Sequence, residues 1–189
     1  MNASVIIPLY VYPSAGAWDP VYEMVLSYPR VQFTAIVNPH SGPGEGMLPN
    51  EDYLQAIQTL NSFSNVRTIG YVATTWFKRD LSSVLQDIAV YAGWGNHDSS
   101  LAMSGVFFDE IPTGYSSELV SYLQTISKAV HNSHGLRDGY VGKSDPFISA
   151  LSVLRGLHQT PKPEIGGSRS TASSLYCSAS ATVPRFRSW

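Results

Sequence analysis

Two adjacent acidic residues are the strongest chemical signal in the sequence. Asp109 and Glu110 directly follow the apolar run Gly105–Phe108, which we expect to be a buried strand. Placing two carboxylates at the end of a buried strand costs free energy, because charged groups lose hydration there. Such a cost suggests that the acids have a function. Cleavage of a glycosidic bond needs a pair of carboxyl groups, one protonated and one ionised. The pair also fits a purely structural role, in which both acids bind the backbone of the following segment. Strand alternation sends the two side chains to opposite faces, so at most one points along the axis of a barrel.

Other polar and aromatic residues follow the predicted strands in the same way. They are Tyr10, Tyr12, Trp18, Asn38, His40, Ser41, Glu45, Tyr71, Thr74, Thr75 and Trp76. In parallel α/β folds the functional face lies at the carboxyl ends of the strands. Asn38 is suited to bonding a sugar hydroxyl, although Asn-Pro is also a common turn former.

Several other kinds of site are not supported by the sequence. The segment Ser41–Gly44 resembles a phosphate-binding loop only superficially, because no Lys-Ser/Thr follows it and Pro43 removes an N–H donor. The five histidines lack metal-ligand spacing. Cys177 lies in an irregular segment, so it is not a credible nucleophile.

The first 135 residues alternate between apolar runs and helical patterns, which predicts parallel α/β architecture. Strands are expected at 5–12, 31–37, 66–73 and 105–108, and helices at 18–28, 51–63, 80–92 and 116–131, with Asn50 as an N-cap. Four such units fill half of a closed (β/α)8 barrel, which typically has roughly 250 residues. The sequence thus predicts a partial TIM-like barrel.

The chain changes character after residue 135. Residues 1–135 hold five Lys/Arg and eleven Asp/Glu, whereas residues 136–189 hold seven and three. No strand comparable to the first four is expected after Val130. One further helix is expected at 147–157, followed by a Ser-, Pro- and Gly-rich tail that reads as disordered. We therefore divide the chain into a half barrel, 1–135, and a non-matching tail, 136–189. The change fits a shifted reading frame, a retained intron or a misjoined exon.

Composition excludes some classes of partner. A net charge of −2 gives no electrostatic case for nucleic acid, and no apolar run is long enough to span a membrane. The opening residues lack the basic and apolar regions of a secretory signal. Location and oligomeric state stay open.

Four motifs, in order, resemble the spherulin-4 domain (spherulation-specific family 4). They are Val5-Ile-Ile-Pro-Leu-Tyr-Val-Tyr-Pro13 with Gly16-Ala17-Trp18, then 33–44, Gly70-Tyr-Val72, and 105–110. The resemblance covers about residues 4–135. It implies a (β/α)-barrel glycoside hydrolase, similar to secreted fungal endo-acting enzymes that cleave galactosaminogalactan, an α-1,4-linked polymer rich in N-acetylgalactosamine, without a cofactor.

The resemblance also assigns roles to particular residues. Asp109 and Glu110 match the Asp-Glu pair of the family and become catalytic candidates, with acid and nucleophile unassigned. Tyr10, Tyr12, Asn38 and Tyr71 become substrate contacts. The family has a further essential Glu after an Asn-Pro-Gly segment, which this chain lacks, so we expect impaired catalysis. Two alternatives stay open: a non-catalytic polysaccharide-binding or structural protein, and a damaged gene product without stable function.

Overall fold

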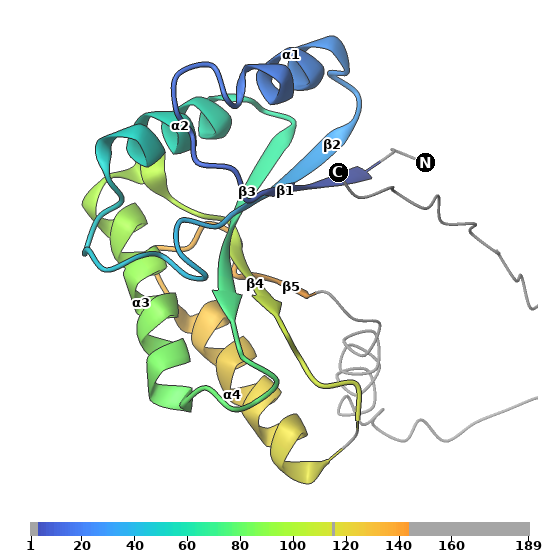
Figure 1. The fold of residues 1–189 in the computed structure, drawn as a ribbon, viewed down its shortest axis with the longest axis vertical. Helices are drawn as coiled ribbons and strands as arrows, with labels where there is room; N and C mark the ends of the chain where they lie inside the picture. Colours follow the sequence, from blue (N-terminus) through green and yellow to red (C-terminus); the bar gives the residue numbers. More distant parts are fainter. Residues whose placement is uncertain (1–3, 115, 144–189) are drawn as a thin grey trace, which may run out of the picture.

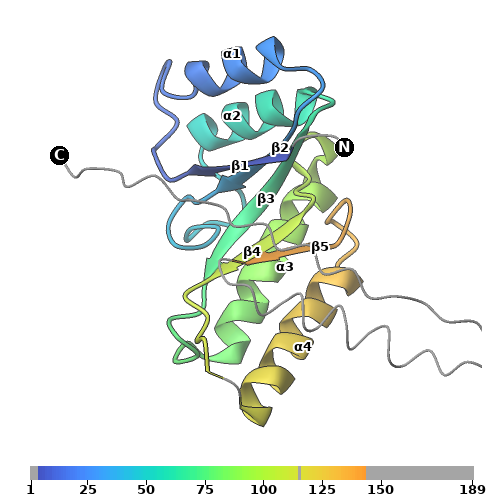
Figure 2. The same ribbon diagram turned by 90° about the vertical axis from the view of Figure 1, so that its right-hand side faces the viewer.

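The protein forms a parallel sheet with helices packed on one face, as a computed structural model shows (Figure 1). The structure describes residues 4–114 and 116–143. The strands are β1 (Ser4–Leu9), β2 (Gln32–Val37), β3 (Val66–Ala73), β4 (Gly105–Asp109) and β5 (Tyr140–Lys143), and they lie in chain order, all parallel (Figure 2). The helices are α1 (Asp19–Ser27), α2 (Glu51–Ser62), α3 (Leu81–His97) and α4 (Ser117–Asn132), with a 3-10 turn at Ser99–Leu101. The predicted parallel α/β class is confirmed.

The sheet has a short fifth strand that the sequence did not reveal. We expected no strand comparable to the first four after Val130, and the four-residue β5 pairs with β4 from Gly105↔Tyr140 to Phe108↔Lys143. The segment is short and contains Gly142, so it lacks the long apolar run that marked the other strands. Its order comes from the ladder that β4 offers, which local sequence does not reveal. The expected helix at 147–157 and the tail from 159 lie outside the described residues.

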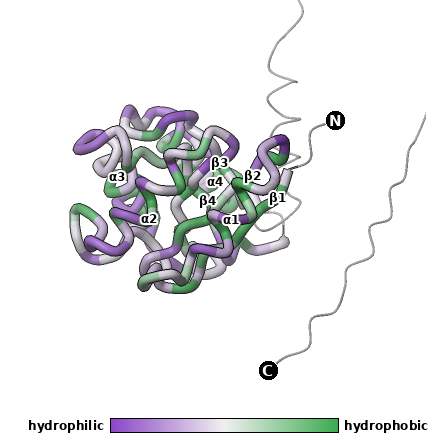
Figure 3. The backbone as a smooth tube through the Cα atoms, turned by 90° about the horizontal axis from the view of Figure 1, so that it is seen from above, coloured by the Kyte–Doolittle hydropathy of each residue, from purple (hydrophilic) through white to green (hydrophobic). Residues whose placement is uncertain are grey.

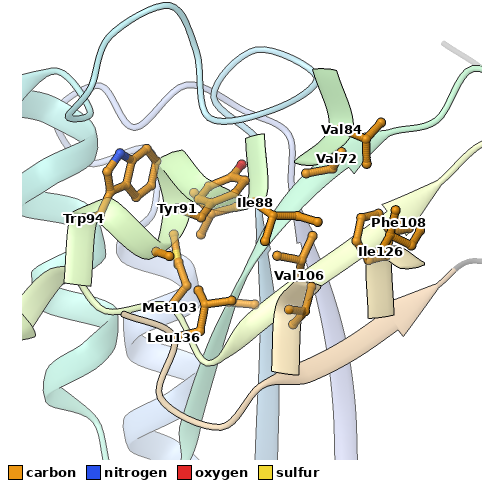
Figure 4. Packing of buried hydrophobic residues seen from close by; sticks show 14 of the residues in the cluster. Val72, Val84, Ile88, Tyr91, Trp94, Met103, Val106, Phe108, Ile126 and Leu136 are labelled. Atoms are coloured by element: carbon orange, nitrogen blue, oxygen red, sulfur yellow. The ribbon is translucent and has the colours of Figure 1, made fainter. Parts of the chain in front are cut away.

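The main core lies between the sheet and the helices. Val72, Val106 and Phe108 point from the strands toward Ile88 of α3 and Ile126 of α4 (Figure 4), and all five are at most 1% exposed. Seen from above, green hydrophobic stretches follow β1 and β2, and hydrophilic stretches lie at the periphery (Figure 3). Residues at every second position of each strand supply this layer, as expected for a sheet covered on that face.

Alternate residues form a smaller cluster on the other face of the sheet. It consists of Ile36, Ile69, Tyr71, Ala73 and Phe107, with Tyr140 against it. The register explains the grouping, because Ile36 pairs with Ile69 and Tyr71 pairs with Phe107. Ala73 pairs with Asp109, so Asp109 continues the same row. The strands therefore deliver Asp109 to the face that no described helix covers.

The boundaries of the elements follow from local physics. Asn50 caps α2 as expected, since its Oδ1 accepts a 3.0 Å hydrogen bond from the Tyr53 N–H. β1 is shorter than the expected 5–12 run because its ladder stops where β2 stops, at Leu9↔Val37. α3 runs five residues past the expected end, because the buried Trp94 ring packs edge-on against Tyr91, with centroids 4.8 Å apart.

Candidate functional site

The six residues expected to form a site lie at one edge of the sheet. Because the strands are parallel, their carboxyl ends share that edge (Figure 1). We call these residues the strand-end site: Tyr10 and Tyr12 after β1, Asn38 after β2, Tyr71 in β3, Asp109 at the end of β4, and Glu110 directly after it.

Asp109 is held by two hydrogen bonds. Its Oδ2 accepts from the Tyr71 hydroxyl at 2.9 Å, and its Oδ1 accepts from the Glu110 backbone N–H at 2.8 Å. The side chain is half-buried. Both oxygens act as acceptors, so the orientation of the carboxyl group is fixed before any ligand arrives.

Glu110 departs from strand geometry, with a φ of +57°. Left-handed backbone costs a non-glycine residue roughly 1–2 kcal/mol, and it ends the alternation on which the expectation of opposite faces depended. The charges of both acids raise the pKa of Tyr71, after the larger effects of burial and its hydrogen bond to Asp109. The expectation that the two side chains point to opposite faces assumed regular strand geometry, which Glu110 does not have.

Thr74 and Trp76 hold the Glu110 backbone in this conformation. The hydroxyl of Thr74, which is 1% exposed, lies 2.9 Å from the carbonyl oxygens of both Asp109 and Glu110. The Trp76 backbone N–H donates to the backbone carbonyl oxygen of Glu110 at 2.7 Å. Sequence reasoning placed Thr74 at the strand end but gave it no role, because these bonds join residues 35 and 36 positions apart.

Tyr71 and Tyr10 form an aromatic wall beside Asp109. Their rings meet edge to face with centroids 5.5 Å apart, and Tyr71 also packs against Phe107. Burial is the main cause that raises the pKa of Tyr71, and likewise that of Tyr10, where Asp109 adds to it. Both phenols therefore remain neutral and able to donate, while the Tyr10 ring stays 51% exposed.

Tyr12 is fixed by α2. Its hydroxyl donates to Asp52 Oδ2 at 2.5 Å and accepts from Asn50 Nδ2 at 3.1 Å. The ring packs edge-on against Tyr53 and remains 46% exposed. The sequence did not reveal the contact between Tyr12 and Asp52, because the two residues are 40 positions apart.

Asn38 carries an unsatisfied acceptor. Its Oδ1 is buried and has no hydrogen-bond partner within the described part of the chain. Its backbone oxygen accepts a 3.3 Å hydrogen bond from the Tyr53 hydroxyl. A buried acceptor without a donor costs about 1–3 kcal/mol, and a ligand N–H or O–H would relieve that cost.

Strained backbone gathers in the loops at this edge. Among the described residues, the non-glycine positions with positive φ are Ser41, Thr75, Trp76, Phe77 and Glu110, and all follow β2, β3 or β4. Such outliers cluster at functional sites, since surrounding structure must hold them in place. Here the Arg79–Asp87 ion pair, at 2.6 Å, helps to hold the loop after β3, because Arg79 Nη1 also donates to the backbone carbonyl oxygen of Ala73.

Other candidate chemistry does not gather at this edge. Within residues 4–114 and 116–143, no group of three or more His, Cys, Asp or Glu side chains is placed to hold a metal. Asp138 forms an ion pair with Arg67 at 3.7 Å, where the Tyr140 ring also lies, at the amino ends of β3 and β5. Asp145 and Glu164 lie outside the described residues. In the described segments no helix meets the length and hydropathy of a membrane span.

The fold and this edge together define a parallel α/β domain with a carboxylate and aromatic site at its strand ends. The family model of spherulation-specific family 4 matches residues 4–148. The chain belongs to this family, and the match includes β5.

A solved structure supports the same relationship. The chain is similar to Sph3 of Aspergillus clavatus, whose crystal structure was determined in complex with GalNAc, at 43% identity and a TM-score of 0.75. The similarity covers 80% of this chain and 62% of the Sph3 chain, so the match spans less than two thirds of that protein. No curated protein sequence matches significantly.

Proposed function

We propose that the protein hydrolyses a polysaccharide that contains N-acetylgalactosamine, with Asp109 and Glu110 as two of the reacting carboxyl groups. The observation that carries the proposal is the Asp109 carboxylate, fixed by Tyr71 and by the Glu110 N–H at the carboxyl-end edge of a parallel sheet. The GalNAc complex of Sph3 supports the substrate class. The finer assignment, endo-acting cleavage of an α-1,4-linked polymer such as galactosaminogalactan, is part of the proposal.

The remaining strand-end residues have binding roles in this proposal. Exposed faces of Tyr10 and Tyr12 offer apolar surface on which a pyranose ring can stack. The unsatisfied Oδ1 of Asn38 accepts a hydrogen bond from a sugar hydroxyl or an acetamido N–H. Tyr71 orients Asp109 and stays protonated, because burial raises its pKa.

We further propose that the described sheet is part of a TIM-like (β/α) barrel. Five parallel strands in chain order, with helices on one face, support this architecture. Closure requires strands beyond β5 to reach the free edge of β1. The division of the chain at residue 135 into a half barrel and a non-matching tail remains a prediction. Sequencing the transcript across the codons for 130–145 tests whether the reading frame is continuous there.

The test is release of reducing ends from α-1,4-linked N-acetylgalactosamine oligosaccharides. We expect Asp109→Asn and Glu110→Gln each to lower kcat by a factor on the order of 10²–10⁴, the usual contribution of an acid or base. Glu23→Gln, which changes an exposed acid on α1, is the matched control and should retain wild-type activity. Full activity of both site variants would refute the catalytic assignment.

A non-catalytic polysaccharide-binding protein is the second candidate. The exposed rings of Tyr10, Tyr12 and Trp76, at 51%, 46% and 59%, favour it because binding requires only such surfaces. Binding of the oligosaccharide by the wild type without release of reducing ends would select this function.

A further inference from the structure

A cavity lies outside the strand-end site, between the loop that leads into α3 and the first turns of α4. Its volume is about 640 Å³, within the range of roughly 300–1,000 Å³ that is typical of ligand sites. It is lined by Phe77, Lys78, Arg79, Asp80, Leu81, Ser117, Glu118, Ser121, Tyr122 and Thr125. We call it the α3–α4 cavity.

One wall of the cavity is a strained turn that presents aromatic rings. Thr75, Trp76 and Phe77 all have φ between +51° and +67°. Each such residue costs on the order of 1–3 kcal/mol unless surrounding structure holds it, and the Trp76 N–H bond to the Glu110 oxygen does so. The turn leaves Trp76 59% and Phe77 36% exposed. Of the two exposed rings, that of Phe77 lines the cavity.

The floor of the cavity combines an aromatic ring with polar groups. Tyr122 packs edge-on against Phe77, with centroids 4.8 Å apart, and is 7% exposed. The Tyr122 hydroxyl is buried and has no hydrogen-bond partner among the described residues. Three hydroxyl side chains of α4 line the same space: Ser117, Ser121 and Thr125. Rings beside several hydroxyl groups match a sugar, which has apolar faces and many hydroxyls.

The charged side chains around the cavity disfavour an anionic ligand. Arg79 is neutralised by Asp87 at 2.6 Å, which leaves Lys78 against Asp80 and Glu118. Hydrogen bonds from its own backbone N–H and from the Ser116 and Ser117 hydroxyls lower the pKa of Glu118, so it remains charged. With Arg79 paired to Asp87, the charges of the other lining residues leave an excess of acid, which favours a neutral sugar or one with an amino group over a uronate or a sulfated sugar.

We propose that the α3–α4 cavity is a second saccharide-binding site, which takes a neutral or amino-bearing hexose unit of the polysaccharide. The identity of the polymer rests on the proposed function, whereas the existence of the site rests on the cavity alone. The segment from Thr74 to Phe77 joins the two sites, because it contacts Asp109 and Glu110 at one end and lines the cavity at the other. A long chain held in the cavity is thereby kept close to the strand-end site.

The test is co-sedimentation of the full chain with an insoluble N-acetylgalactosamine polymer, in an Asp109→Asn background that prevents turnover. Ser121→Trp fills the cavity from an exposed position of α4, and Phe77→Ala removes the ring from its wall. We expect each change to raise the Kd for the polymer roughly tenfold, the effect of one lost aromatic contact. Gln124→Trp, also exposed on α4 but outside the cavity, is the matched control and should bind as the parent does.

Two outcomes separate this proposal from the proposed function. If Ser121→Trp and Phe77→Ala bind the polymer as tightly as the parent does, the second site is refuted, whatever the hydrolytic activity. If both weaken binding while the wild-type chain releases no reducing ends, the cavity stands and the catalytic proposal fails. In an active protein, Ser121→Trp should slow hydrolysis of the polymer but leave that of a trisaccharide unchanged.

Discussion

At the scale of single residues, the site depends on how Asp109 and Glu110 are held. The motif and its position at a strand end were predictable, because a buried apolar run followed by two acids is visible in the sequence. The left-handed backbone of Glu110 and the bonds from Thr74 were not, since they depend on contacts between β3 and β4. The consequence is that strand geometry stops at Asp109, whose carboxylate accepts from the Tyr71 hydroxyl.

Thr74 gives a prediction at this scale. Thr74→Val keeps the shape but removes the hydroxyl that bonds the Asp109 and Glu110 carbonyls, so we expect a loss of about 1–3 kcal/mol in stability. We also expect kcat to fall with little change in KM, because the backbone that positions Glu110 loosens. Thr74→Ser keeps the hydroxyl and should retain both the stability and the kcat of the wild type. Denaturant unfolding measures the stability, and steady-state kinetics measure kcat and KM. Equal kcat for the Val variant and the wild type would argue against a positioning role.

At the scale of elements, the alternation of strands and helices was predictable and the fifth strand was not. Each long apolar run became a strand because one of its faces packs on the helices, as Val106 and Phe108 show. β5 has four residues, including Gly142, and its partner β4 supplies the hydrogen bonds that order it. The motif Gly70-Tyr-Val72 also gains a physical reason, because the Tyr91 ring lies directly on Gly70.

Gly70 and Gly93 form a matched pair of substitutions. A Cβ on Gly70 would lie 2.5 Å from Tyr91 Cζ, and Tyr91 is fully buried, so Gly70→Ala should cost about 1–3 kcal/mol of stability. A Cβ on Gly93, within α3, meets nothing within 4 Å, so Gly93→Ala should add about 0.5–1 kcal/mol. Denaturant unfolding of both variants measures the difference. Destabilisation by the two substitutions alike would contradict this packing.

At the scale of the whole molecule, the described chain is a parallel sheet with one covered face and a functional edge. The alternation of apolar runs and helical patterns predicted parallel α/β architecture, and the buried layer between sheet and helices agrees. That core contains a tyrosine, Tyr91, whose hydroxyl donates to the backbone carbonyl oxygen of Tyr71 at 2.9 Å. Its ionisation links global stability to pH.

We expect stability to fall as the pH rises above about 10. Burial, with a smaller contribution from Asp87, raises the pKa of Tyr91 well above its ordinary value, so the folded state retains a proton that the unfolded state loses. Unfolding free energy therefore declines by up to about 1.4 kcal/mol per pH unit from this residue. Tyr91→Phe should flatten the decline in urea titrations between pH 9 and 11. Identical slopes for variant and wild type would disprove the linkage.

The central claim is that the carboxyl ends of the strands form a saccharide site, and its most direct test is an amide NMR titration with an N-acetylgalactosamine oligosaccharide. We predict shifts at residues 10–12, 38–41, 71–76 and 109–110, which lie together at one edge of the sheet. Shifts confined to the opposite edge, around Arg67 and Asp138, or no shifts at Tyr71 and Asp109 at saturating sugar, would contradict the account.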